Sequence, residues 1–154
     1  MLVQCPSRCI DLTLSHLHEA GRSRRECGVL WLGKRTATNI QIEVCYRPIQ
    51  SAAEDMFEIP RAGMQVLHGE LRQRRLMVAA QVHSHPAEAF HSRADDRWAI
   101  IRHEGALSLV LPYFAAHTTP SSFMQDAKVY RFSSAAMWTE VPGGQVQREC
   151  LEIF

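Results

Sequence analysis

Two histidines, His83 and His85, are followed closely along the chain by Ser92 and Asp95. Imidazole nitrogens and carboxylate oxygens are ligands that zinc binds readily, and catalytic zinc sites combine three protein ligands with one open position. The two histidines and Asp95 therefore predict a metal site that has a serine hydroxyl beside it. A carboxylate far upstream, Glu26, is the candidate for the base that such a site needs. Together these residue types predict a zinc hydrolase.

The elements around these residues predict how they come together. The histidines end the apolar run 76–82, which is typical of a buried strand. Side chains two positions apart in a strand point to the same side, so both imidazoles should project from one face of the strand end. Asp95 falls on the first turn of a predicted helix over 92–103, whose apolar positions 94, 98 and 101 follow helical spacing. A short loop beginning at Pro86 would bring that turn back over the strand end.

Each of these residues also has a plain structural explanation. Ser92 and Asp95 form a good helix start, with the serine as N-cap and the aspartate near the positive end of the helix dipole. A His-x-His pair at a strand end is often structural or merely exposed. Glu26 alone would be read as an ordinary exposed carboxylate. Capping and packing by themselves do not account for five such residue types in this order on a strand end, a loop and a helix start.

In this pattern the chain resembles the JAMM (MPN+) metalloproteases, whose motif is a distant Glu, then His-x-His-Pro, a spacer and Ser-x-x-Asp. The matching positions are Glu26, His83, His85, Pro86, Ser92 and Asp95. The resemblance implies that His83, His85 and Asp95 hold Zn²⁺. It also implies that Glu26 takes a proton from the metal-bound water and that Ser92 donates a hydrogen bond to the developing oxyanion.

The spacer 87–91 is one residue shorter than in the commonest form of the motif. His91 and Asp96 therefore remain alternative ligands, and the spacing from Ser92 favours Asp95.

The fold class predicted by the pattern of elements is α/β. Two amphipathic helices are marked by Ile10, Leu14 and Leu17 and by Met64, Leu67 and Leu71. Strands are predicted at 28–32, 40–46, 76–82, 107–111 and 128–132, and turns at 120–122 and 142–144. The apolar end 150–154 fits a last strand or a contact surface. This order favours a sheet flanked by helices, and the resemblance implies the curved mixed sheet of a cytidine-deaminase-like MPN/JAB domain.

Length and composition restrict the remaining possibilities. The 154 residues predict one domain, 1–154, and the 46% hydrophobic content is normal for a soluble globular chain. No stretch approaches the ~20 apolar residues of a membrane helix, and the N-terminus lacks the features of a signal peptide. The net charge of +1 gives no reason to expect nucleic acid as a partner. Five cysteines without framework spacing suit free thiols. We therefore expect a cytoplasmic protein with neither nucleic acid nor membrane as a partner.

The resemblance also implies a substrate. JAMM enzymes of this kind hydrolyse the amide or isopeptide bond after the C-terminal tail of ubiquitin or a ubiquitin-like protein. The compact chain is similar to bacterial members, which accompany ubiquitin-like conjugation systems, including antiphage ones. It is thus expected to trim or remove a ubiquitin-like modifier, with E1-like and E2-like enzymes as further partners. Two other functions stay open, a catalytically inactive MPN scaffold and a hydrolase that releases a small group from a carrier protein.

Overall fold

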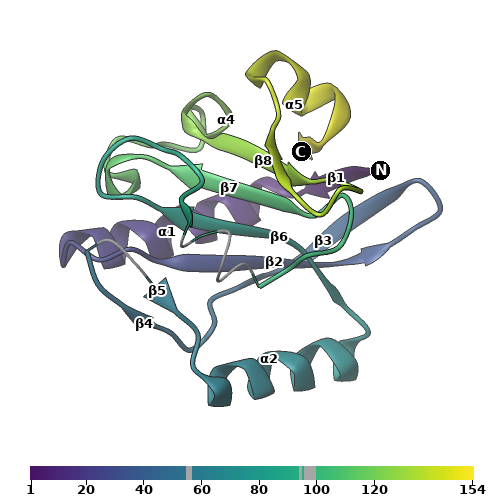
Figure 1. Ribbon diagram of the computed structural model, residues 1–154, viewed down its shortest axis with the longest axis horizontal. Coiled ribbons are helices and arrows are strands. Elements are labelled where there is room, and N and C mark those ends of the chain that lie inside the picture. The colour runs from purple at the N-terminus through teal and green to yellow at the C-terminus, as the bar shows by residue number, and fades with distance from the viewer. Residues whose placement is uncertain (55–56, 94, 96–99) are drawn as a thin grey trace.

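A mixed β-sheet forms the centre of the protein (Figure 1). The computed structural model describes residues 1–54, 57–93, 95 and 100–154. Within them, eight strands lie in the order β10-β1-β3-β2-β6-β7-β8-β9, and β4 and β5 pair separately. The pairs β10–β1, β1–β3 and β6–β7 are parallel, and the other neighbours are antiparallel. The strands are β1 (Leu2–Cys5), β2 (Gly28–Arg35), β3 (Asn39–Tyr46), β4 (Ser51–Ala52), β5 (Phe57–Glu58), β6 (Met77–Ser84), β7 (Leu107–Leu111), β8 (Lys128–Phe132), β9 (Trp138–Glu140) and β10 (Leu151–Ile153).

Helices cover both faces of the sheet. The helical elements are α1 (Ser7–Arg22), α2 (Arg61–Arg74), the short turn η1 (Tyr113–Ala115), α4 (Phe123–Asp126) and α5 (Gly143–Glu149). Ile10 of α1 packs in one buried cluster with Val29 and Trp31 of β2, whereas Leu67 of α2 packs in another with Leu30. Successive strand residues point to opposite faces, so α1 and α2 lie on opposite sides of the sheet. None of the described helices is long and apolar enough to cross a membrane.

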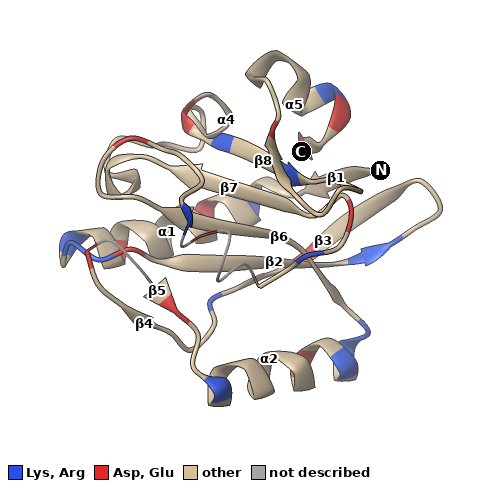
Figure 2. Cartoon of the chain, in the orientation of Figure 1, with Lys and Arg blue, Asp and Glu red and all other residues tan. Residues whose placement is uncertain are grey.

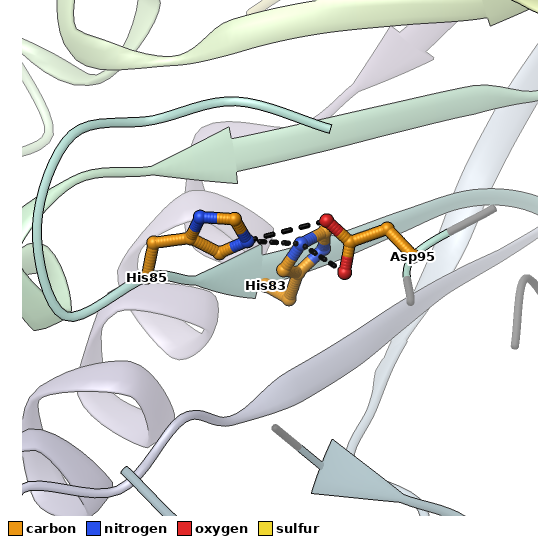
Figure 3. A group of neighbouring side chains, drawn as sticks. All are labelled: His83, His85 and Asp95. Atoms are coloured by element: carbon orange, nitrogen blue, oxygen red, sulfur yellow. Dashed lines mark hydrogen bonds and ion pairs between the residues drawn. The ribbon is translucent and has the colours of Figure 1, made fainter. Parts of the chain in front are cut away.

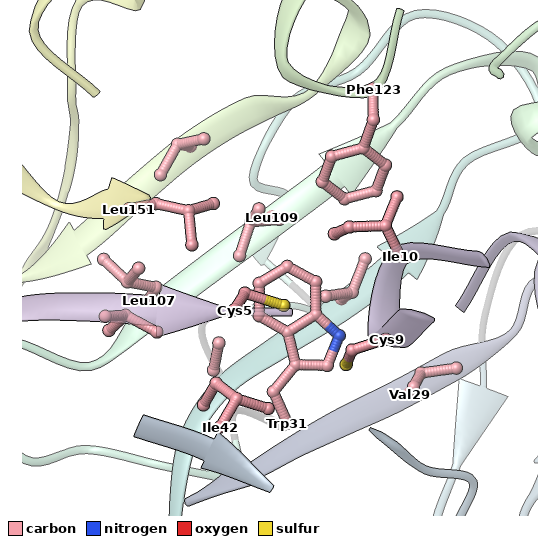
Figure 4. Close-up of a cluster of buried hydrophobic side chains, with 14 of the residues drawn as sticks. Cys5, Cys9, Ile10, Val29, Trp31, Ile42, Leu107, Leu109, Phe123 and Leu151 are labelled. Atoms are coloured by element: carbon pink, nitrogen blue, oxygen red, sulfur yellow. The ribbon is translucent and has the colours of Figure 1, made fainter. Parts of the chain in front are cut away.

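The larger buried cluster is built around Trp31 at the middle of β2 (Figure 4). Its ring lies 6.1 Å from that of Phe123, centroid to centroid. The indole Nε1 donates a hydrogen bond of 2.9 Å to Thr13 Oγ1 on α1, and this hydroxyl donates in turn to the carbonyl of Cys9 at 2.7 Å. The one polar atom of the indole is therefore satisfied inside the core, as burial requires. This contact fixes α1 against the strand that leads from Glu26.

Most of the predicted elements are confirmed. Both amphipathic helices occur as α1 and α2, and the five predicted strands correspond to β2, β3, β6, β7 and β8. The apolar end forms β10, which pairs in parallel with β1, an N-terminal strand that the sequence did not reveal. The predicted turn at 142–144 is wrong, because α5 begins at Gly143 with Pro142 as its N-cap. Pro142 has the extended backbone of a residue just outside a helix, and the two glycines that follow it adopt the helical conformation of the first turn.

The predicted helix over 92–103 is wrong at its C-terminal end. Positions 93 and 95 are helical, positions 94 and 96–99 lie outside the described residues, and residues 100–103 are not helical. The backbone N–H of Ile100 donates instead to Oε1 of Gln81 on β6 at 3.2 Å. This N–H therefore bonds to a side chain of the neighbouring strand and not to a helix carbonyl. Apolar spacing along the chain does not predict such a contact between distant residues.

Basic residues follow both long helices (Figure 2). Arg22 lies in the last turn of α1, and Arg72 and Arg74 lie in the last turn of α2. The sequence carries two arginine-rich runs, 22–25 and 72–75, and cations complement the negative end of a helix dipole, which explains their position at the helix ends. Arg24, just past α1, forms an exposed ion pair with Glu54 at 2.8 Å.

Gly33 lies where the register between β2 and β3 shifts. A Cβ added there would lie 2.3 Å from the carbonyl oxygen of Gln41, which is backbone and cannot swing aside. We expect Gly33→Ala to lower the free energy of unfolding by about 1–3 kcal/mol, as overpacking does. A Cβ at Gly69 in α2 would meet nothing within 4 Å, so Gly69→Ala should raise that free energy by about 0.5–1 kcal/mol. Urea denaturation measures both, and an unchanged Gly33→Ala variant would contradict the close approach.

Candidate metal centre

Three side chains, those of His83, His85 and Asp95, converge at the end of β6 (Figure 3). Nε2 of His83 lies 3.2 Å from Nε2 of His85 and 3.1 Å from Oδ1 of Asp95. The second carboxylate oxygen of Asp95 lies 3.2 Å from Nε2 of His85. The two imidazoles are 1% and 4% exposed. Two imidazole nitrogens and both oxygens of one carboxylate, all atoms of the types that bind metals, therefore meet in a buried place, with each imidazole facing a different oxygen of Asp95.

The spacing of these groups fits a metal ion. Zinc bonds of about 2.0–2.2 Å in a tetrahedral site place the ligand atoms about 3.3–3.6 Å apart. The two Nε2 atoms, 3.2 Å apart, are close to that range, and Asp95 brings an oxygen to within 3.2 Å of each imidazole. Two imidazole nitrogens and one carboxylate oxygen also match the ligand types of catalytic zinc and leave a fourth position open. Among the described residues, His83, His85 and Asp95 are the group of His, Cys, Asp and Glu that could hold a metal.

Asp95 is carried by a capping box at the start of the helical turn. Its Oδ2 accepts a hydrogen bond from the backbone N–H of Ser92 at 2.7 Å, and its own N–H donates to Ser92 Oγ at 3.0 Å. This reciprocal pair of hydrogen bonds is the helix-capping role that the sequence offers for Ser92 and Asp95. The same carboxylate faces the imidazoles, so the capping role and the metal-binding geometry occur together. The cap fixes the rotamer that aims Asp95 at His83 and His85.

The surroundings of Asp95 favour its ionised form. Burial works to raise the pKa of this carboxyl, but hydrogen bonds to His83 and His85, the charge of His83 and the backbone N–H of Ser92 together outweigh burial. They hold the pKa of Asp95 well below its usual range. The site therefore presents the carboxylate that a metal ligand must be at neutral pH.

Aromatic rings hold the two imidazoles in place. The ring of Phe57 on β5 lies 5.8 Å from that of His83, and the ring of Phe90 meets His85 edge-on at 4.7 Å. Nδ1 of His83 has no hydrogen-bond partner within the described part of the chain, so packing rather than a second hydrogen bond orients this ring. Gly28 leaves room for Phe57, because a Cβ there would lie 2.2 Å from its ring. Neither phenylalanine belongs to a sequence pattern that predicts a place at this site.

Glu26 lies just before β2, beside the end of β6. Gly28 pairs with His83 in the antiparallel register of β2 and β6, so Glu26 lies two residues before a residue that pairs with one of the histidines. It is 4% exposed, which shows that the reading as an exposed carboxylate was wrong. It lines a cavity of about 240 Å³ with Arg25, Arg47 and Gln50.

One alternative ligand is placed elsewhere by the structure. The ring of His91 lies against Tyr130 at 5.2 Å and against Trp138 at 5.1 Å, on the side of β8 and β9. His91 is not a member of the group that His83, His85 and Asp95 form. The other alternative, Asp96, lies outside the described residues. The geometry thus favours Asp95 as the third ligand.

A left-handed turn supports the backbone of His85. Tyr113, Phe114 and Ala115 have φ angles of 54°, 54° and 56°, a conformation that costs non-glycine residues about 1–3 kcal/mol each. The N–H of Phe114 donates to the His85 carbonyl at 2.7 Å, and that of Tyr113 donates to the Ala87 carbonyl at 2.9 Å. These bonds hold the start of the loop that carries Ser92 and Asp95. No glycine or asparagine marks the turn, so the sequence did not reveal it.

The five cysteines are free thiols, as predicted. Burial raises the pKa of Cys27 to about 11. A hydrogen bond with Cys9 and burial likewise raise the pKa of Cys45. A thiol is nucleophilic as the thiolate, so these side chains are unreactive at neutral pH. Cys5 and Cys9 belong to no metal-binding group among the described residues.

Three comparisons relate the chain to known proteins. The sequence pattern of a family described as prokaryotic homologs of the JAB domain matches residues 8–124. The probable metalloprotease y4jG of Sinorhizobium fredii is 33% identical over 150 residues, which cover 95% of this chain and 91% of that protein. The solution structure of a protein from Desulfitobacterium hafniense superposes with a TM-score of 0.67 at 17% identity, over 99% of this chain and 93% of the other. At that identity the superposition shows a shared fold.

Proposed function

The chain belongs to the JAB-domain family of JAMM/MPN metalloproteases, and from this premise we propose that it is a zinc-dependent isopeptidase acting on a ubiquitin-like modifier. The observation that carries the proposal is the convergence of His83, His85 and Asp95, with the buried Glu26 two residues before Gly28, the residue that pairs with His83. A bond at the modifier's C-terminal tail is the one we expect it to cut.

His83, His85 and Asp95 would hold the metal through Nε2, Nε2 and a carboxylate oxygen. When bound, zinc supplies Lewis-acid polarisation of the scissile carbonyl and lowers the pKa of water. The burial of both imidazoles and the capping box at Asp95 keep these ligands in place without the metal. Such preorganisation favours binding, because little side-chain freedom is lost when the ion enters.

Glu26 is the general base in this proposal. A carboxylate oxygen of Glu26 takes a proton from the attacking water and later delivers it to the leaving amine nitrogen. Its 4% exposure keeps bulk solvent from competing for that proton. The hydrogen bond of 2.8 Å from its backbone N–H to the Ala53 carbonyl ties the segment to the stretch between β4 and β5.

Ser92 is the hydrogen-bond donor to the oxyanion in this proposal. Its Oγ accepts a hydrogen bond from the N–H of Asp95, and a serine hydroxyl that accepts one bond still carries its own O–H donor. Donation of that proton to the oxygen of the scissile carbonyl is typically worth about 3 kcal/mol in the transition state. Ser92 and Asp95 form one capping box, so the Ser92 hydroxyl is held next to the proposed metal ligand Asp95.

The walls of the site support a tail of small residues as the substrate. Phe57 and Phe90 flank the two imidazoles, and Phe90 is 53% exposed at the rim. A glycine-rich tail can lie extended between such rings where side chains would clash. Tails of this kind end the ubiquitin-like proteins on which JAMM enzymes act, and bacterial conjugation or antiphage systems with E1-like and E2-like enzymes are the setting we propose.

Cleavage of fusion proteins tests the proposal. We expect a ubiquitin-like β-grasp protein fused to a reporter to be cut after its tail. The kcat/KM of a free tail peptide should be at least about 10-fold lower, because a single pocket discriminates by only about 10–200-fold and docking of the folded partner adds further discrimination. A chelator should stop the reaction, and a thiol-blocking reagent should leave it unchanged. Efficient cleavage of the peptide alone would favour a small substrate, and a purified protein without metal would favour a scaffold.

A further inference from the structure

The ladder between β2 and β6 changes its pattern at the pair Cys27 and Ser84. Gly28 turns its N–H and carbonyl away from β6, toward the side-chain amide of Gln50, with both hydrogen bonds at 2.9 Å. The next pair should therefore exchange two backbone hydrogen bonds. The N–H of Ser84 does donate to the Cys27 carbonyl at 3.2 Å, but the N–H of Cys27 donates to the hydroxyl of Ser84 at 3.2 Å. A side chain thus forms one rung of the ladder.

Beyond this rung the two chains separate. The N–H of His85 donates to the Leu111 carbonyl at 2.8 Å, so β6 continues toward β7. The N–H of Glu26 donates to the Ala53 carbonyl at 2.8 Å, so its segment continues toward β4. Glu26 and His85 would be direct neighbours if the ladder went on. The Ser84 hydroxyl ends the ladder at the point where the chain carrying Glu26 must separate from the chain carrying the histidines.

We propose that the hydroxyl of Ser84 is a positioning group that sets the separation between the Glu26 carboxylate and the imidazoles of His83 and His85. The inference rests on the proposed function of Glu26 and the histidines. Ser84 is fully buried, and strand alternation points its side chain away from the face that carries the imidazoles. It therefore touches no substrate and acts through the backbone of Cys27, the residue next to Glu26.

Ser108 provides a matched control. It is also a fully buried serine on a central strand, and its hydroxyl accepts a hydrogen bond from Gln81 Nε2 at 3.2 Å. Ser84→Ala and Ser108→Ala each remove one buried hydrogen bond of similar length. Only the first of these bonds ends on the segment that carries Glu26. A general loss of packing should affect both variants, whereas a positioning role should separate them.

The test measures three quantities separately: the hydrogen bond from the Cys27 N–H to the Ser84 hydroxyl, the position of Glu26 and the turnover. We expect Ser84→Ala to keep about one zinc per chain and to speed amide hydrogen exchange at Cys27 by about 10-fold or more, since its N–H loses its acceptor. In Co²⁺-loaded protein, the paramagnetic relaxation of the Glu26 carboxylate carbon should change by about twofold, because this carbon moves on the order of 1 Å relative to the metal. The same misplacement should lower kcat on a cleaved fusion about 10–100-fold and leave KM unchanged. Ser84→Thr, which keeps the hydroxyl, should restore all three.

The control variant and the relaxation data decide between the outcomes. An unchanged Glu26 relaxation in Ser84→Ala would overturn the proposal, and so would equal losses in Ser84→Ala and Ser108→Ala. Unchanged kcat in Ser84→Ala, despite faster exchange at Cys27, would overturn it as well. If the wild-type protein cuts no modifier fusion, the proposed substrate is wrong, and the relaxation of Glu26 in the three variants still decides the role of Ser84.

Discussion

Replacement of one metal ligand, in His85→Ala or Asp95→Asn, should remove zinc from the purified protein. Changing groups that merely support metal ligands weakens binding about 10–100-fold, so loss of one of three ligands should cost at least that factor. Asn at position 95 keeps an oxygen that can accept the N–H of Ser92, so the capping box and the fold should survive. Metal analysis of the purified variants measures the loss, with about one zinc per chain expected in the wild-type protein.

The alternative ligands supply the controls for this experiment. Asp96→Asn and His91→Phe should retain full zinc, because the ring of His91 packs against Tyr130 and Trp138 and a phenyl ring keeps those contacts. Full zinc in Asp95→Asn together with loss in Asp96→Asn would show that the third ligand is the next residue along the chain. Thermal unfolding of each variant in the presence of a chelator separates loss of metal from loss of fold.

Glu26→Gln should preserve the fold and the zinc content but abolish turnover. The amide is nearly the same size as the carboxylate, which matters for a residue that is 4% exposed, but it cannot accept a proton. General acid–base catalysis typically contributes about 10²–10⁴-fold, so kcat should fall by that order while KM changes little. Single-turnover assays on a cleaved fusion, with metal analysis of the same sample, measure the effect.

Glu54→Gln is the matched control for the base. Glu54 lies one residue beyond Ala53, the backbone partner of Glu26, and its side chain is 58% exposed in an ion pair with Arg24. Loss of an exposed ion pair costs little, so Glu54→Gln should keep full activity. Unaltered turnover in Glu26→Gln would remove this residue from the mechanism, whatever the control shows.

Much of the framework of the site follows from local patterns in the sequence. The apolar run before the histidines predicts a strand, which is confirmed as β6, and the two-residue spacing predicts that His83 and His85 lie on one side, which is confirmed by their Nε2 atoms 3.2 Å apart. Helical spacing likewise predicts α1 and α2. These inferences hold because periodicity reports which side chains are buried, and it depends on residues close together in the chain.

Contacts between distant segments decide the rest. The sequence left Asp95, Asp96 and His91 open as the third ligand, and only the closing of the loop over β6 brings Asp95 to within 3.2 Å of both imidazoles. Glu26 is buried where its segment meets Ala53, which follows it by more than 20 residues in the chain. The left-handed turn at 113–115 and the side-chain rung at Ser84 have no local signature. Residue types and spacing determine which chemistry this protein can perform, whereas strand register and loop closure determine where each group lies, because those depend on pairings that no single segment specifies.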